Sequence, residues 1–171
     1  MTTTDTDRDA LEAALAGHGE YELFACDPAL ADTAAFCAAY GFALEDSANT
    51  IVVIGKSDPP VYAACVVLAT HRLDVNRVVK QRLGTRKASF ASPDETRALT
   101  GMAIGGVTAF GLPDGLPLWI DSRVMARDRI VVGGGSRSVS EEHHHAYPAR
   151  NDGEAARRVC QQGAFTASRS H

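Results

Sequence analysis

Hydrophobic and polar positions follow strand spacing in the middle of the chain. Two β-branched runs, Thr50–Ile54 and Val61–Leu68, flank a turn rich in glycine, serine and proline. β-branched side chains pack well on a pleated surface, so these runs predict a hairpin of buried strands. Two shorter runs, Leu118–Ile120 and Arg129–Val132, predict further strands.

Helical spacing and capping residues predict four helices around these strands. Ser92 followed by Glu95 forms a capping box, in which a hydroxyl and a carboxylate satisfy the first amide groups of a helix. Asp74 is the expected N-cap of a helix that Gly84 ends. The four helices are expected at about residues 8–16, 27–40, 74–84 and 92–99, with the first two before the sheet. Strands and helices do not alternate regularly, so the pattern predicts an α+β fold.

Composition adds limits on the class of protein. With 171 residues and 45% hydrophobic residues, the chain is expected to bury one real core. No apolar run approaches the roughly 20 residues that span a bilayer, and the first residues lack a secretory signal core. We therefore expect a soluble, cytoplasmic protein. The four cysteines are widely separated, which favours buried thiols over a zinc knuckle or a redox dithiol.

Glycine is concentrated in one part of the chain. Eight of the fifteen glycines lie between Thr100 and Gly135, mainly in the segments 101–111 and 133–135. Glycine adopts positive φ at low cost and lets a ligand approach the peptide N–H groups. These segments therefore predict a site built from main-chain atoms.

One segment is basic although the chain carries a formal net charge of −4. Between Arg72 and Lys87 there are six cations and a single acid, Asp74. Such a cluster can hold phosphate groups, and it is equally typical of the solvated face of a helix. The sequence leaves both interpretations open.

A series of short motifs in fixed order resembles the YbaK/prolyl-tRNA synthetase-associated domain family. The motifs are Lys87-Ala88-Ser89-Phe90-Ala91-Ser92 with Glu95, Leu99-Thr100-Gly101, Gly105-Gly106-Val107-Thr108, Gly111-Leu112-Pro113, Ile120-Asp121 and the triplet at Gly133. The resemblance covers about residues 20–138. It implies a single domain with a mixed, barrel-like sheet flanked by helices, preceded by a helix and polar lead in residues 1–19. Residues 139–171 are then expected to form a polar tail whose composition favours disorder.

The resemblance also implies an activity. Members of the family are trans-editing deacylases that hydrolyse the ester of mischarged aminoacyl-tRNA, without metal or nucleotide. The expected partners are aminoacyl-tRNA and an aminoacyl-tRNA synthetase, and a monomer is expected over an oligomer. Backbone amides of Gly105 and Gly106 would hold the aminoacyl carbonyl as an oxyanion develops. Substrate groups would carry much of the proton transfer, because no Ser/His/Asp arrangement is recognisable.

The resemblance assigns roles to further residues. Asn49 joins Gly105 and Gly106 in the expected catalytic set. The charge of the basic segment, and not the resemblance, places the expected phosphate contacts on Arg77, Lys80 and Arg82. The substrate-binding set contains Thr50, Val107, Thr108, Ala109, Asp121, Gly133 and Gly134.

Two residues depart from the family pattern. The family usually carries a lysine where this chain has Asn49, and a loop proline where it has Ala109. Asparagine still donates hydrogen bonds but lacks the charge that strengthens them. An alternative function is therefore a binding module for tRNA ends or amino acids that has lost the chemistry. A third is a docking domain for a synthetase through the basic helix.

The three histidines His143, His144 and His145 are a weak candidate for a metal site. Adjacent strand residues point to opposite faces, so only the first and third could share an ion, and no third ligand is evident. We expect an exposed tail there, followed by a marginal helix at 153–162.

Overall fold

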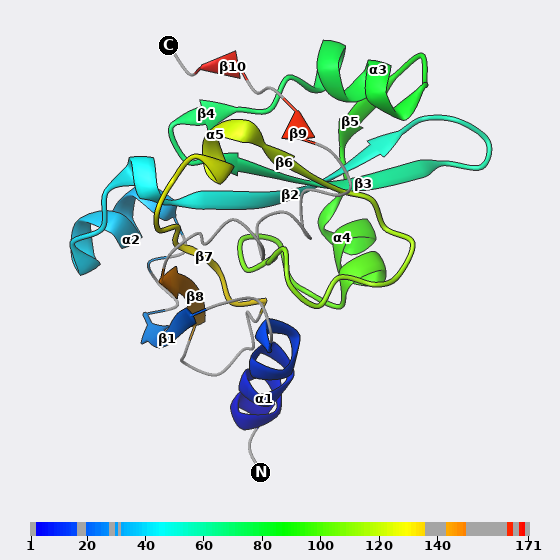
Figure 1. Cartoon of the computed structure of the whole chain (residues 1–171). Helices are drawn as coiled ribbons and strands as arrows, with labels where there is room; N and C mark the ends of the chain where they lie inside the picture. Colours follow the sequence, from blue (N-terminus) through cyan, green and yellow to red (C-terminus); the bar gives the residue numbers. More distant parts are fainter. Residues whose placement is uncertain are drawn as a thin grey trace.

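A mixed five-stranded sheet forms the centre of the molecule (Figure 1). The computed structural model describes residues 3–16, 20–27, 30, 32–135, 143–149, 164–165 and 168–169. The strand order is β5-β2-β3-β6-β9, with antiparallel pairing of β2 to β3 and β5, and parallel pairing of β6 to β3 and β9. The strands are β2 (Ala48–Gly55), β3 (Val61–Leu68), β5 (Ala88–Phe90), β6 (Leu118–Asp121) and β9 (Ala164–Phe165). The predicted hairpin and the predicted strand that begins at Leu118 are confirmed.

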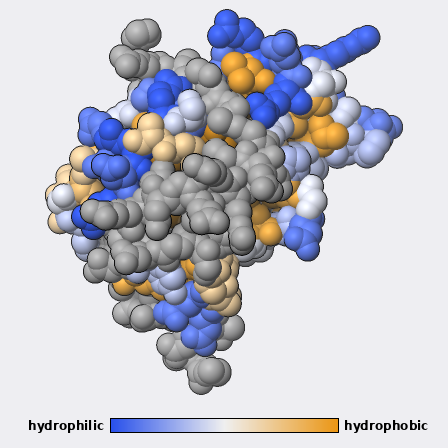
Figure 2. All heavy atoms as spheres, in the orientation of Figure 1, coloured by the Kyte–Doolittle hydropathy of each residue, from blue (hydrophilic) through white to orange (hydrophobic). Residues whose placement is uncertain are grey.

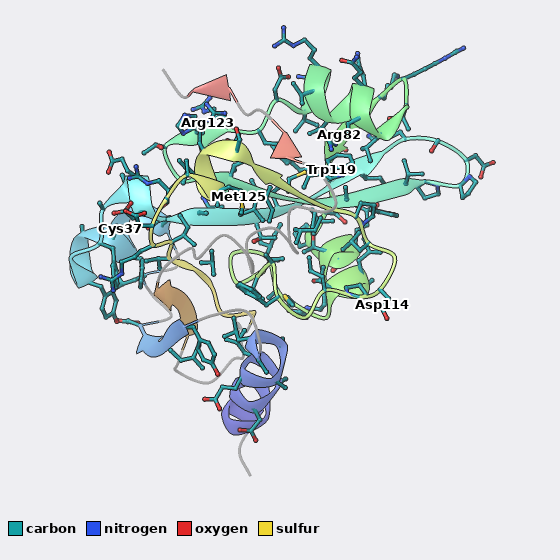
Figure 3. All side chains as sticks on the ribbon, viewed as in Figure 1. Cys37, Arg82, Asp114, Trp119, Arg123 and Met125 are labelled. Atoms are coloured by element: carbon teal, nitrogen blue, oxygen red, sulfur yellow. The ribbon has the colours of Figure 1, made fainter. Side chains whose placement is uncertain are left out.

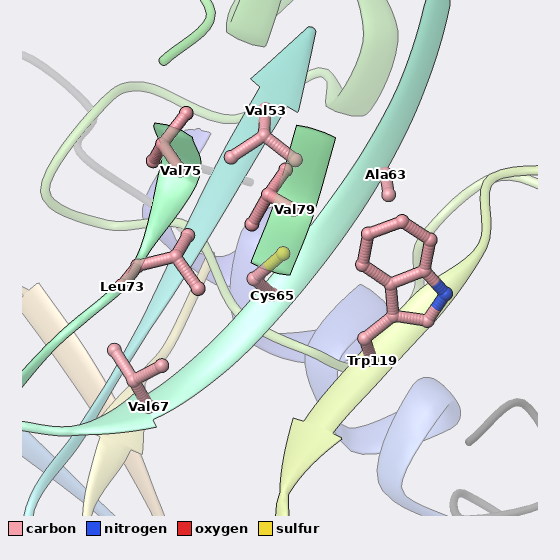
Figure 4. Close-up of a cluster of buried hydrophobic side chains, with 8 residues drawn as sticks. All are labelled: Val53, Ala63, Cys65, Val67, Leu73, Val75, Val79 and Trp119. Atoms are coloured by element: carbon pink, nitrogen blue, oxygen red, sulfur yellow. The ribbon is translucent and has the colours of Figure 1, made fainter. Parts of the chain in front are cut away.

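One face of this sheet is covered by the basic helical segment. Its first turn, η3 (Val75–Val79), is a π-helical turn, since Val79 N–H donates to the carbonyl of Asp74. It continues as α3 (Lys80–Leu83) and ends at Gly84, whose φ is 66°. Figure 4 shows the buried cluster on this face, which contains Val53, Ala63, Cys65, Val67, Leu73, Val75, Val79 and Trp119. The predicted N-cap Asp74 is confirmed, because its carboxylate accepts from Arg77 N–H at 3.0 Å.

The other face packs against the N-terminal helix and the segment after β6. Strand residues alternate between faces, so Ala48, Val66 and Leu68 point away from α3. They pack with Leu11 and Leu15 of α1 (Thr3–Leu15) and with α5 (Ser122–Met125). The helix α1 begins five residues earlier than the sequence predicts. Both faces of the central sheet are thus buried by helices.

A second, smaller sheet has the order β1-β8-β7. Its strands are β1 (Glu20–Cys26), β7 (Val132–Gly133) and β8 (His143–Ala149). A parallel bridge between Ser47 and Val131 joins it to the start of β2, and β4 (His71–Arg72) pairs separately with β10 (Ser168–Arg169). Segments placed in the polar tail by sequence, such as 143–149, therefore contribute backbone to sheets. The side chains of the three histidines and the helix expected at 153–162 lie outside the described residues.

The region before β2 differs from the sequence prediction. The second helix, α2 (Thr33–Tyr40), begins after Asp32, whose carboxylate accepts from Ala35 N–H at 3.0 Å. The N-cap is therefore Asp32 and not Asp27, which follows β1 and donates its N–H to the Tyr40 hydroxyl. The prediction that only two helices precede the sheet is also wrong, because β1 lies between α1 and α2. A short turn, η2 (Leu44–Asp46), then leads into β2.

The helix α4 (Pro93–Thr100) matches its prediction closely. Ser92 accepts from Glu95 N–H at 3.2 Å, and Glu95 accepts from Ser92 N–H at 2.7 Å. The α+β class and the mixed sheet with flanking helices are confirmed. In the described part of the chain, no helix has the length and hydropathy needed to cross a bilayer.

Candidate functional site

A cavity of about 460 Å³ lies at the edge of the central sheet beside β2. Its wall is made by α2, β2, β5, the start of β7 and the glycine loop, which we define as residues 101–113. Its described lining residues are Leu30, Thr33, Phe36, Ser47, Ala48, Asn49, Thr50, Ile51, Val52, Phe90, Ala91, Thr96, Ile104, Gly105, Gly106, Val107, Val131, Val132, Gly133 and Gly134. A cavity of this size accommodates a small organic group.

The cavity lies where the edge of β2 has no neighbouring strand among the residues that the structure describes. Ala48 N–H donates to Val131 at 2.9 Å, and Ala91 N–H donates to Val52 at 2.9 Å. Thr50 lies between these two contacts and pairs with neither β5 nor β7. Strand backbone groups point alternately to the two sides, so the N–H and C=O of Thr50 point to the same side as those of Ala48, into this gap.

Thr50 also contributes a side-chain polar atom. Its Oγ1 is buried and has no hydrogen-bond partner among the described residues. Buried polar atoms normally have a partner, and leaving one without costs free energy. The main chain of Thr50 therefore points into the cavity, whereas its hydroxyl has almost no exposed surface and reaches a ligand only after its side chain rotates.

Gly105 lies at the bend of a tight turn in the glycine loop. Gly106 N–H donates to the carbonyl of Ala103 at 3.0 Å, and Gly105 has a φ of 86°. This combination is that of a type II turn, whose third position favours glycine. The amide of Gly106 is thus used within the turn, contrary to the expectation that both glycine amides are open. The Gly105 N–H takes no part in the turn's hydrogen bond.

The glycine loop is held in place from α4. The Thr100 hydroxyl donates to the carbonyl of Thr96 at 2.7 Å and accepts from Met102 N–H at 3.1 Å. Further along, Thr108 N–H contacts the sulfur of Met102 at 3.4 Å. These contacts fix the loop on both sides of the turn at Gly105.

The start of α4 is in turn tied to the central sheet. The Tyr62 phenol lies 3.5 Å from Glu95 Oε1, and burial with the nearby Glu95 charge raises the pKa of Tyr62. The backbone N–H of Ser92, with its hydroxyl, lowers the pKa of Glu95. The carboxylate therefore stays ionised and links β3 to the helix that carries the loop.

The second glycine segment packs directly against the first. A Cβ on Gly133 would lie 2.9 Å from the carbonyl oxygen of Val107, closer than real side chains approach. Gly135 N–H donates to the carbonyl of Gly106 at 2.7 Å. Glycine at 133 is thus required by close backbone approach, which joins the two segments into one wall of the cavity.

Asn49 is oriented by a residue of α2. Its Oδ1 accepts a hydrogen bond from the Thr33 hydroxyl at 2.9 Å. The amide nitrogen then remains as a donor, which is the polar function closest to that of a lysine. Thr33 was not identified from the sequence, because nothing local links it to Asn49.

The described lining of the cavity contains no ionisable side chain. A hydrolytic site with a general base normally holds a His, Glu, Asp, Lys, Tyr or Cys within reach of the substrate. The chemistry that these residues offer is hydrogen bonding from the main chain, the Thr50 hydroxyl and the Asn49 amide. Such donors stabilise a developing negative charge on oxygen.

The structure brings together only part of the predicted site. Seven predicted residues line the cavity: Asn49, Thr50, Gly105, Gly106, Val107, Gly133 and Gly134. Thr108 is a buried residue of the glycine loop, and Ala109 packs toward the cluster that contains Leu11. Asp121 is buried, caps α5 and accepts from Arg123 at 2.8 Å, a bond that raises the pKa of Arg123.

The three predicted phosphate ligands lie outside the cavity lining, on the face of the sheet that α3 covers. Arg77 has a side chain that is 83% exposed and lies 3.4 Å from Asp74. Arg82 places its guanidinium 5.0 Å from the centre of the Trp119 ring, and Figure 3 shows the two side chains together. Figure 2 shows hydrophilic side chains gathered around α3.

Among the described residues, no group of three or more His, Cys, Asp and Glu side chains is arranged to hold a metal ion. The two cysteines described as free thiols, Cys37 and Cys65, are both buried. Neither lines the cavity.

Comparisons with known proteins agree with the fold described above. The model of a family described as an aminoacyl-tRNA editing domain matches residues 27–146. A crystal structure of a candidate trans-editing enzyme for prolyl tRNA synthetase has a TM-score of 0.75 and 17% identity, covering 99% of both chains. A candidate signal transduction protein from Marinobacter aquaeolei VT8 has a TM-score of 0.59 and 15% identity, covering 95% of this chain and 31% of that one. At these identities the structural likeness concerns the fold.

Proposed function

Because the chain belongs to the aminoacyl-tRNA editing domain family, we propose that it hydrolyses the ester bond of mischarged aminoacyl-tRNA in trans. The observation that carries the proposal is the cavity in the gap beside Thr50, with the Gly105 turn as its opposite wall. An ester on the ribose of a tRNA end is an uncharged group with several hydrogen-bond acceptors. It matches a cavity whose described lining is mostly apolar and carries a few polar groups, none of them charged.

The Gly105 N–H donates to the ester carbonyl in this proposal. Donors fixed before the reaction stabilise the oxyanion more than donors that must reorganise. The hydroxyl and backbone of Thr50 hold the remaining polar atoms of the aminoacyl group, and the Asn49 amide takes the position of the family lysine. Val107, Gly133 and Gly134 shape the wall beside the substrate side chain.

The reaction adds water to the ester carbonyl carbon and breaks the bond to the ribose oxygen. The ribose oxygen leaves with a proton that originates from the attacking water, and the amino acid leaves as a carboxylic acid. A neighbouring group of the substrate, such as the adjacent ribose hydroxyl, relays that proton, since an activated ester demands less of the enzyme than an amide. The proposal therefore needs no ionised side chain in the cavity.

The phosphates of the tRNA lie outside the cavity, on Arg77, Lys80 and Arg82. Support comes from the charge of this segment and from the exposure of Arg77. Cations at an exposed surface bind phosphate by releasing counterions, so binding should weaken as salt rises.

A deacylation assay tests the proposal. Purified protein is incubated with a panel of tRNAs carrying correct and incorrect amino acids, with the tRNA for proline charged with alanine or cysteine among them. We expect hydrolysis of at least one mischarged species well above the spontaneous rate. Spontaneous rates across the whole panel would overturn the proposal.

The second candidate function is a binding module of the same fold, and the observation that favours it is asparagine at position 49. Asn49→Lys separates the two. Hydrolysis that appears only in the lysine variant indicates a module that has lost catalysis. Equal hydrolysis in both forms shows that Asn49 suffices here.

A further inference from the structure

Two large hydrophobic side chains are exposed on the lining of the same cavity. Phe90, at the end of β5, is 56% exposed, and Ile104, beside the Gly105 turn, is 47% exposed. The other exposed large hydrophobic residues of the described chain, Tyr21, Tyr40 and Val61, do not line it. Exposed hydrophobic residues that converge on one opening mark a binding surface more strongly than scattered ones.

Phe90 also stands between the cavity and the basic segment. It pairs with Val53 across β2 and β5, so both side chains point to the same face of the sheet. Val53 packs against Val75 and Val79 of η3, the turn that carries Arg77. A chain leaving the cavity on this side passes Phe90 before it reaches the cations.

The chemistry of the cavity limits which part of a tRNA end enters it. A lining without a described cation disfavours phosphate, because burying an unpaired charge is costly. The aminoacyl group and its ribose fit inside, and the terminal base must then lie at the opening. Bases of single-stranded ends are commonly held by stacking on aromatic side chains.

We propose that the Phe90 ring is the platform on which the terminal base of the tRNA 3′ end stacks, with Ile104 packing against the opposite side of that base. The inference rests on the proposed function, since it names how that substrate is positioned. It assigns Phe90 a binding role and leaves the hydrolytic step to the main-chain donors.

Steady-state deacylation provides the first test. Phe90→Leu keeps a hydrophobic strand residue but removes the ring, and we expect KM to rise about 5- to 150-fold with little change in kcat. Phe90→Trp should restore KM to the wild-type value. Tyr21→Ala, which removes an exposed aromatic side chain away from the cavity, should leave KM unchanged. If Phe90→Leu keeps the wild-type KM, the platform is wrong although the proposed function stands.

A binding measurement tests the platform without catalysis. An acceptor-stem RNA hairpin with 2-aminopurine as its terminal base should lose fluorescence on binding wild-type protein, because stacking quenches that base. Phe90→Leu should abolish the quenching, and Phe90→Trp should keep it. Quenching that survives in Phe90→Leu overturns the inference. Quenching lost in that variant supports it even if no form of the protein hydrolyses the ester.

Discussion

Thr50 shows how a single residue of this chain is placed for binding at a cost to folding. Its hydroxyl is buried without a partner among the described residues, in a strand whose neighbours Ala48 and Val52 are well packed. An apolar side chain of the same shape would avoid this cost. In the proposed function, the substrate supplies the missing partner once the side chain rotates toward it.

Thr50→Val should raise the free energy of unfolding by about 1 kcal/mol, because it removes a buried polar atom without changing the volume. The same variant should lower kcat/KM for deacylation. Thr33→Val is the matched control, because the Thr33 hydroxyl donates a hydrogen bond to Asn49. This variant should lower the free energy of unfolding. Urea unfolding of both variants measures the difference, and a loss of stability in Thr50→Val contradicts this interpretation.

Cys65 is expected to be inert in the folded protein. It is fully buried in the cluster beneath η3, and burial raises the pKa of its thiol to about 12. The thiolate is the reactive form, so almost none exists at about pH 8. Iodoacetamide should label Cys65 only after denaturation, as mass spectrometry would show. Rapid labelling of the folded protein would contradict the packing of this cluster.

Local chemistry determines which elements could be predicted. Asp74 and the Ser92–Glu95 pair were identified from sequence because a cap acts within one turn. The start of α2 was wrong because the sequence offers two aspartates before the apolar run; Asp32 caps the helix through Ala35 N–H, whereas Asp27 donates its N–H to the Tyr40 hydroxyl. β1 was missed because its partner β8 lies more than a hundred residues further along the chain.

Removing the cap of α4 tests its role in holding the glycine loop. Ser92→Ala should lower the free energy of unfolding by about 1 kcal/mol. Ser122→Ala, at an exposed helix start without a cap role, should change it by less than about 0.5 kcal/mol. Equal effects of the two substitutions would show that the capping box contributes nothing to the free energy of unfolding.

The capping box also has a predictable pH dependence. The pKa of Glu95 lies below its ordinary value of 4.5 in the folded state, mainly because of the Ser92 N–H. Because the pKa is lowered in the folded state, the stabilisation of the fold by the Glu95 carboxylate is present above the ordinary pKa. It is lost as the pH falls through the folded value. NMR titration of Glu95 should give a higher pKa in Ser92→Ala than in the wild type. An unchanged value would show that the Ser92 hydroxyl does not contribute to the shift.

At the scale of the whole molecule, the site depends on contacts between distant segments. The cavity exists because β5 pairs with one end of β2, the Ser47–Val131 bridge lies at the other, and Thr50 is left between them. Sequence could indicate the glycine loop, since glycine clusters are visible locally, and motif order indicated the fold. It could not indicate that Gly106 uses its amide within the turn, that Asp121 lies outside the cavity, or that Phe90 borders it. Those facts follow only from packing.

The most direct test compares two glycines of the same loop region in single-turnover deacylation. Gly105 and Gly115 have φ of 86° and 88°, but only Gly105 lines the cavity. Alanine disfavours positive φ, so both substitutions strain the backbone similarly. At Gly105, relief of that strain turns the peptide that carries the donor N–H away from the cavity. We predict that Gly105→Ala lowers the rate about 100-fold, whereas Gly115→Ala stays within about threefold of wild type. Wild-type rates in Gly105→Ala would contradict the account.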